Sequence, residues 1–227
     1  MSIDGKKILI SPSIIASDLT TMGMRVKTFD SGLVDLLHLD VMDGNFVPNL
    51  TFGPGYIRDL KKQSSIPLDV HLMIERPERS IQEYIDIAPW AITIHYESTR
   101  FPARVLQQLR KAGIIAGIAV NPATPVESIF DLVSYADMVL IMSVDPGFYG
   151  QAFMEPAIGR IQKLSKFLAS LPERKMMIQV DGGIGPDNIA RVVSAGATVI
   201  VAGNSAFKGG DVNNNVRELI ERAHTGL

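Results

Sequence analysis

Short apolar runs alternate with longer amphipathic segments from one end of the chain to the other. Eight of these runs are nearly continuous in Ile, Val, Leu and Met, which is typical of parallel strands covered on both faces of the sheet. We therefore predict eight parallel strands, at Ile8–Ile14, Leu36–Val41, Leu68–Met73, Ala91–His95, Ile115–Val120, Met138–Val144, Met177–Val180 and Val199–Ala202.

The segments between the runs carry apolar residues at helical spacing. Phe101–Ala112 gathers its apolar residues on one side, as a helix with one buried face does. Pro156–Leu168 and Pro186–Ala195 are predicted as further helices, each with proline in its first turn. Gly113 and Gly196 follow the ends of two of these helices, where a residue with positive φ commonly closes the last turn.

Eight strand–helix units in 227 residues predict a closed (β/α)8 barrel, the TIM barrel of the α/β class. An open, doubly wound sheet is the structural alternative. No linker, charge block or low-complexity run divides the chain, so we predict one domain over residues 1–227. Barrel enzymes carry their chemistry on the carboxyl ends of the strands and on the loops that follow them.

Composition narrows the classes of function. The formal net charge is −2, so no broad basic field attracts nucleic acid or an anionic membrane surface. No stretch approaches the roughly 18 apolar residues that a membrane span needs. The chain contains no cysteine, which excludes disulfides, thiolate metal sites and a cysteine nucleophile, and which suits a cytoplasmic location. An anionic ligand would have to be held by local groups such as backbone amides.

Histidine and aspartate residues occupy the ends of three predicted strands. His38 and Asp40 share one face of the second strand, His71 repeats the pattern in the third, and Asp181 follows the seventh. A lone buried histidine more often serves the core, and a lone aspartate at a strand end usually caps the next helix. Four such groups together predict a metal site that zinc, iron, manganese or cobalt could occupy.

Glycine-rich loops follow the last three strands. Glycine lets the backbone approach a ligand closely, and amides at a helix N-terminus bind phosphate without a cationic side chain. One such loop commonly does no more than permit a tight turn, but three neighbouring loops at this end of a barrel predict a phosphate site. The residues concerned are Gly147, Phe148, Tyr149, Gly150, Gly182, Gly183, Gly203, Asn204 and Ser205.

The positions of the lysines argue against two other kinds of barrel chemistry. Lys6, Lys7 and Lys175 precede strands, and no lysine ends a strand at the barrel mouth. A Schiff-base aldolase would therefore lack its nucleophile. The segment Asp40–Asp43 also has no lysine, which argues against the Asp-Lys-Asp array of phosphosugar decarboxylases.

Several segments resemble the ribulose-phosphate 3-epimerase family. The run Asp-Val-Met-Asp-Gly with its Phe-Val-Pro-Asn continuation is highly specific, and the similarity extends over nearly the whole chain. The similar segments are Ser11–Ile14, His38–Asn49, Asp69–Met73, Asp145–Phe148, Val180–Gly183 and Ala202–Ser205. The resemblance implies a ribulose-phosphate-binding (β/α)8 barrel of the pentose phosphate pathway that interconverts D-ribulose 5-phosphate and D-xylulose 5-phosphate.

The resemblance also implies roles for particular residues. One metal ion, typically zinc or iron(II), would be bound by His38, Asp40, His71 and Asp181. The two aspartates would remove a proton from one face of C3 and return one to the other face through an enediolate. Substrate would contact Ser13, Met42, His71, Met73, Met142 and the three glycine loops. Family members commonly self-associate, so a homo-oligomer is expected.

The chain departs from the common pattern of the family at several positions. Tyr149 replaces a glycine, and the segment Ile87–Trp90 replaces the usual Ala-Gly-Ala-Asp before the fourth strand. Asn204 and Ser205 are similar to allulose-6-phosphate 3-epimerase, which leaves a hexulose phosphate as an alternative substrate. A non-catalytic phosphosugar-binding barrel is a second alternative. His95 ends the fourth strand, either near the substrate or in a structural hydrogen bond.

Overall fold

The strands of the protein form one parallel sheet in the order β1-β8-β7-β6-β5-β4-β3-β2. The computed structural model describes residues 8–171 and 176–225. The strands are β1 (Leu9–Pro12), β2 (Leu37–Met42), β3 (Leu68–Met73), β4 (Ala91–His95), β5 (Ile115–Val120), β6 (Met138–Met142), β7 (Met177–Asp181) and β8 (Val199–Ala202). Sequential strands are neighbours around the sheet, as a βα repeat with a constant crossover direction requires.

The sheet closes between its first and last members, β1 and β2. Ser13 and His38 form a parallel bridge at this seam, and the backbone N–H groups of Asp35 and Leu36 donate to the Ile10 carbonyl oxygen. The predicted TIM barrel is therefore confirmed, and the open doubly wound sheet is wrong.

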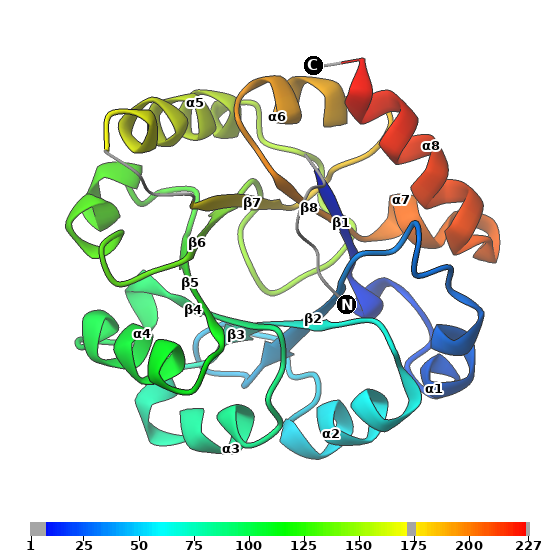
Figure 1. Cartoon of the computed structure of the whole chain (residues 1–227), viewed down its shortest axis with the longest axis horizontal. Coiled ribbons are helices and arrows are strands. Elements are labelled where there is room, and N and C mark those ends of the chain that lie inside the picture. The colour runs from blue at the N-terminus through cyan, green and yellow to red at the C-terminus, as the bar shows by residue number, and fades with distance from the viewer. Residues whose placement is uncertain (1–7, 172–175, 226–227) are drawn as a thin grey trace.

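Helices surround the strands on the outside of the barrel (Figure 1). The α-helices are α1 (Met22–Arg25), α2 (Pro54–Gln63), α3 (Ile81–Ile85), α4 (Pro102–Lys111), α5 (Pro156–Ala169), α6 (Ile189–Ser194), α7 (Asn204–Phe207) and α8 (Val212–His224). Short 3-10 helices lie at Ile14–Ala16, Val26–Thr28, Pro77–Arg79, Tyr96–Ser98, Val126–Leu132 and Lys208–Gly210. None of the helices within the described ranges has the length and apolar character needed to cross a membrane.

The predicted strands agree with the structure to within two residues at each end. One predicted helix starts too early, because α6 begins at Ile189 rather than at Pro186. The Asn188 side chain accepts from the Gly185 N–H and donates to the Gly183 carbonyl, which holds residues 186–188 in a turn. Gly113 and Gly196 have φ angles of 74° and 118°, as their positions after helices predict.

Alternation along the strands separates two cores. Outward-facing aliphatic side chains pack against the helices in one large cluster that includes Leu39, Val70 and Ile200. Inside the barrel, a small apolar cluster that includes Leu36 and Met138 fills one end. Beyond this cluster the inward positions of β1 to β4 are polar except for Met42 and Met73 at the strand ends, and the buried polar residues there are Ser11, Ser13, His38, Asp40, Asp69, His71, Thr93 and His95. The fold therefore concentrates buried polar groups at the end where barrels carry their chemistry.

Candidate active site and metal centre

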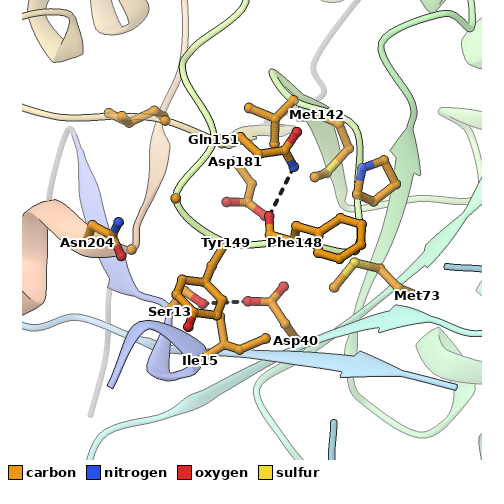
Figure 2. Close-up of a pocket in the computed structure, with 18 of the residues that line it drawn as sticks. Ser13, Ile15, Asp40, Met73, Met142, Phe148, Tyr149, Gln151, Asp181 and Asn204 are labelled. Carbon is orange, nitrogen blue, oxygen red and sulfur yellow. Dashed lines mark hydrogen bonds between the residues drawn. The ribbon is translucent and has the colours of Figure 1, made fainter. Parts of the chain in front are cut away.

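A cavity of about 260 Å³ opens at the carboxyl ends of the strands. Its walls combine side chains from β2, β3, β6 and β7 and from the segment after β1 with the loops after β6, β7 and β8 (Figure 2). The lining residues are Ser13, Ile15, Asp40, Met42, Met73, Met142, Val144, Pro146, Gly147, Phe148, Tyr149, Gly150, Gln151, Asp181, Gly182, Gly183, Ile184, Gly185, Gly203, Asn204 and Ser205.

Four of the predicted site residues converge on one point at the base of this cavity. His38, Asp40, His71 and Asp181 each offer one ligand atom, and these atoms all lie within 4.8 Å of one another. His38 Nε2 is 3.4 Å from His71 Nδ1 and 3.3 Å from Asp40 Oδ1. Nitrogen and oxygen ligands of one zinc ion are about 3.3–3.4 Å apart, so these two spacings are those of atoms that can share a metal ion.

The two histidines are fully buried, whereas the two aspartates reach the cavity. His38 and His71 have no exposed side-chain surface, and neither lines the cavity. His71, which was also expected to contact substrate, therefore lies below the floor. The side chains of Asp40 and Asp181 are 7% and 18% exposed. Figure 2 shows both carboxylates directed toward the middle of the pocket, Asp40 from β2 and Asp181 from β7.

Hydrogen bonds fix the orientation of Asp40. Its Oδ2 accepts a bond of 2.5 Å from the Ser13 hydroxyl, while Oδ1 faces His71 Nδ1 at 3.1 Å. The Thr51 hydroxyl donates to the Asp40 carbonyl oxygen and accepts from the Met42 N–H. Ser13 thus holds Oδ2 of Asp40, while Oδ1 faces His38 and His71 and can serve as a metal ligand.

The end of β7 fixes Asp181 through its backbone. The carbonyl oxygen of Asp181 accepts from both the N–H and the hydroxyl of Ser143. Gly182 follows with φ 119°, and a Cβ at this position would lie 2.6 Å from the Val144 side chain. Only glycine fits this turn, which brings Asp181 to the cavity from the side opposite β2, with β1 and β8 between the two strands.

Negative charge dominates the electrostatics of the cluster. Burial alone would lower the pKa of His38, but the charges of Asp40 and Asp69 raise it well above its usual range. Burial and the Asp40 charge raise the pKa of Asp181 to about 7. Within the part of the chain that the structure describes, no lysine or arginine forms an ion pair with these carboxylates. A bound cation would supply the missing positive charge, so the residues fit a divalent metal.

A further shell of buried side chains surrounds the two histidines. Asp69 Oδ2 accepts from His38 Nδ1 at 2.7 Å and from Gln179 Nε2 at 2.5 Å. His71 Nε2 lies 2.8 Å from Nε2 of His95, and burial lowers the pKa of His95 to about 4. Sequence reasoning missed Asp69 and Gln179, although their inward position, two residues before His71 and Asp181, was a usable signal.

Methionines form an apolar wall on one side of the cavity. Met42 and Met73 cluster with Val47, while Met142 packs with Leu140 and Val144. All three methionines line the cavity. Figure 2 places Met73 and Met142 on one side of the pocket and Asn204 on the other. The methionines therefore lie across the cavity from Asn204 in the loop after β8.

The glycine loops after β6, β7 and β8 meet around Asn204 and Ser205, and this part of the cavity is called the glycine end: a Cβ at Gly150 would lie 3.2 Å from the Asn204 side chain, and one at Gly185 would lie 3.8 Å from Ser205. Gly147 has φ 113°, and a Cβ there would lie 2.9 Å from Val47. Gly183 has φ 62°, and a Cβ there would lie 2.3 Å from the Phe153 nitrogen. No lysine or arginine occurs among the described residues of the cavity wall, whereas Lys6, Lys7 and Lys175 lie outside the described residues. An anion at this end would be held by backbone amides and by small polar side chains.

The fold and the site together define a (β/α)8 barrel with a candidate metal centre at the carboxyl ends of its strands. The family model described as the ribulose-phosphate 3 epimerase family matches residues 9–207. The chain therefore belongs to the ribulose-phosphate 3-epimerase family, as its motifs predicted.

Curated relatives agree with this assignment. The ribulose-phosphate 3-epimerase of Aquifex aeolicus is 40% identical over 211 residues, which cover 93% of this chain and 95% of the relative. The Bacillus subtilis enzyme of the same name is 34% identical over 93% of this chain and 98% of its own length. The chloroplastic ribulose-5-phosphate-3-epimerase of Arabidopsis thaliana is 40% identical over 93% of this chain and 76% of its own.

Solved structures of lower sequence identity share the barrel. The 3-keto-L-gulonate-6-phosphate decarboxylase of Vibrio cholerae superposes with a TM-score of 0.71 at 13% identity, covering 98% of this chain and 100% of its own. The 3-hexulose-6-phosphate synthase of Salmonella typhimurium gives 0.69 at 16% identity, with 97% and 100% coverage. These similarities concern the fold alone.

Proposed function

We propose that this protein is a metal-dependent ribulose-phosphate 3-epimerase that interconverts D-ribulose 5-phosphate and D-xylulose 5-phosphate. One observation carries the proposal. Asp40 and Asp181 reach one cavity from β2 and β7, and together with two buried histidines they form a cluster of metal-ligand type. Membership in the family and the names of its curated relatives support the same reaction.

The two carboxyl groups suit an inversion at a carbon next to a carbonyl. One of them takes the C3 proton from one face of the sugar, and the other returns a proton to the opposite face. Burial raises the pKa of Asp181 to about 7, whereas contacts with His38 and His71 outweigh burial and lower the pKa of Asp40. Two neighbouring carboxyl groups with different proton affinities are what an acid–base pair needs.

The remaining residues bind and orient the sugar phosphate. A divalent cation held by His38, Asp40, His71 and Asp181 supplies Lewis-acid stabilisation of the negative charge that develops on the substrate oxygens. Met42, Met73 and Met142 close the reaction end with groups that cannot exchange protons. The loops at Gly147–Gly150, Gly182–Gly183 and Gly203–Ser205 hold the phosphate at the other end.

The proposal extends to the metal, the assembly and the cellular location. Two imidazoles and two carboxylates suit zinc or iron(II), with manganese and cobalt as further candidates. We propose one ion per chain, a homo-oligomeric assembly and a cytoplasmic location, the last in keeping with the absence of cysteine. Metal analysis of the purified protein and reconstitution of chelated protein with each metal test the identity of the ion and its number per chain.

Exchange of the C3 proton with solvent tests the reaction directly. Metal-loaded protein in deuterated buffer is expected to incorporate deuterium at C3 of ribulose 5-phosphate and to form xylulose 5-phosphate. Binding of the sugar without exchange would instead indicate a non-catalytic phosphosugar-binding barrel. Parallel assays with allulose 6-phosphate compare sugar length, and a large preference for the hexulose would overturn the choice of substrate.

A further inference from the structure

The two histidines of the proposed metal centre are supported from behind by different groups. His38 Nδ1 donates to the buried carboxylate of Asp69, a common arrangement for a metal ligand. His71 has no carboxylate behind it, because its Nε2 faces Nε2 of His95 at 2.8 Å. This inference rests on the proposed metal centre and adds residues that lie outside the cavity wall.

The contact between His71 and His95 determines where both rings carry their protons. A hydrogen bond between two ring nitrogens needs one donor and one acceptor. Since His71 Nδ1 must be unprotonated to bind a metal, its proton lies on Nε2 and is donated to His95. His95 therefore carries its own proton on Nδ1.

The orientation of the two rings suits this bond. Their planes differ by 24° and their centroids are 4.9 Å apart, so the rings lie nearly in one plane and meet edge to edge. The lone pair of His95 Nε2 points along the ring plane toward the His71 N–H. On its other side His95 packs against Phe46 at 4.8 Å between centroids, and its side chain has no exposed surface.

Glu97 lies on the far side of His95. Its Oε2 is 3.4 Å from His95 Nδ1, a close contact without hydrogen-bond geometry, and Nδ1 has no hydrogen-bond partner within the described residues. Glu97 Oε1 accepts from the Asn121 N–H at 2.8 Å and from the Thr124 hydroxyl at 2.5 Å. The carboxylate is therefore anchored to the loop after β5, where it can orient the His95 N–H.

We propose that His95, oriented by Glu97, positions His71 as a metal ligand by accepting its Nε2–H. His95 is a positioning residue, because it is buried behind His71 and does not line the cavity. Loss of such a partner typically weakens metal binding by roughly 10- to 100-fold.

Cobalt(II) binding to chelated full-length protein tests the proposal. His95→Phe keeps a ring of similar size but removes the acceptor, and it is expected to raise the Kd for Co²⁺ by roughly 10- to 100-fold and to alter the visible absorption of the bound ion. His95→Gln retains an acceptor oxygen and is expected to restore most of the affinity. The matched control is Ser98→Ala, which removes only a hydroxyl bonded to the His95 carbonyl oxygen.

Either outcome of the titration is decisive. A His95→Phe protein that binds Co²⁺ within about twofold of the unmodified affinity, with an unchanged spectrum, would overturn the proposal. If this variant does not fold, Glu97→Ala replaces it, with a weaker effect expected in the same direction and an unchanged Kd contradicting the proposal. Unmodified protein that binds Co²⁺ but does not epimerise would reject the proposed function without touching this inference.

Discussion

The two ends of the cavity handle negative charge by different means. At the metal end, buried side chains on β2, β3 and β7 bring together two imidazoles and two carboxylates that require a cation. At the glycine end, loops with positive φ angles present backbone to the cavity and contribute no charged side chain to hold an anion. Strands therefore fix the geometry of side chains, while glycine loops let the backbone approach a ligand closely.

The largest effect is expected from removing a carboxylate at the metal end. Asp40→Asn and Asp181→Asn should each lower kcat by roughly 10³-fold or more, because each loses both a proton-transfer group and a metal ligand. Steady-state epimerase assays measure the loss. Asp59→Asn on the exposed face of α2 is the control and should leave kcat unchanged. Near-normal activity in either cavity variant would remove the pair from the mechanism.

At the glycine end, two glycines that line the same cavity offer a matched test. Gly183→Ala forces a Cβ toward the Phe153 backbone at positive φ and should cost roughly 1–3 kcal/mol of stability and raise KM. Gly185→Ala meets only the Ser205 Cβ at 3.8 Å and should be nearly neutral. Denaturant unfolding measures the stability of both variants, and steady-state assays measure their KM. Equal effects in the two variants would contradict the proposal that close backbone approach at Gly183 holds the substrate.

Chelated protein should show the unbalanced charge of the metal end as a dependence of stability on pH. The folded-state pKa of Asp181, raised from 3.8 to about 7, means that its contribution to stability is present below pH 3.8 and is lost as the pH rises to about 7. The raised pKa of His38 acts in the same direction. The lowered pKa of Asp40 acts only in acid. The lowered pKa values of His71 and His95 act in the opposite direction, because the protons that these histidines bind in the unfolded chain are lost as the pH rises through 6.5. The losses from Asp181 and His38 are expected to exceed this gain, so chelated protein should melt at a lower temperature at pH 8 than at pH 6.

Two further melting curves sharpen this prediction. Metal-loaded protein should lose most of the difference between pH 6 and pH 8, because the cation compensates the carboxylates. Chelated Asp181→Asn should show a smaller difference than the unmodified chain, since one titrating group is gone. An increase of the melting temperature with pH in chelated protein would contradict the charge balance described for the cluster.

The smallest effect is expected outside the site, in the turn between α3 and β4. Ala88 has φ 52°, a conformation that glycine adopts freely and that costs alanine roughly 1–2 kcal/mol, more than the unfolded-state entropy that glycine adds. Ala88→Gly should raise stability by roughly 0.5–1 kcal/mol without changing kcat or KM. The Lys61 ammonium donates to the carbonyl oxygens of Ile87 and Ala88. Lys61→Met removes these two hydrogen bonds and is therefore a separate control for the stability of this turn. A loss of stability in Ala88→Gly would contradict the backbone strain inferred from the positive φ angle of Ala88.

Much of the fold could be predicted because burial has a period that the chain displays locally. Alternation placed His38, Asp40 and Met42 on one inward face, and the structure agrees. The start of α6 was missed because the Asn188 side chain holds a turn that proline and aspartate alone do not reveal. The positions of the candidate ligands were therefore accessible, while their detailed geometry was not.

By itself the sequence determined the eight strands, their order, the inward-facing polar positions and the candidate ligand set, since each follows from local periodicity and residue chemistry. Only the tertiary structure decided which ring nitrogens face the cluster, that His71 lies below the cavity floor, and that His95 and Glu97 stand behind it. The physical reason is that these contacts join different strands, and their distances depend on how the barrel closes through the Ser13–His38 seam.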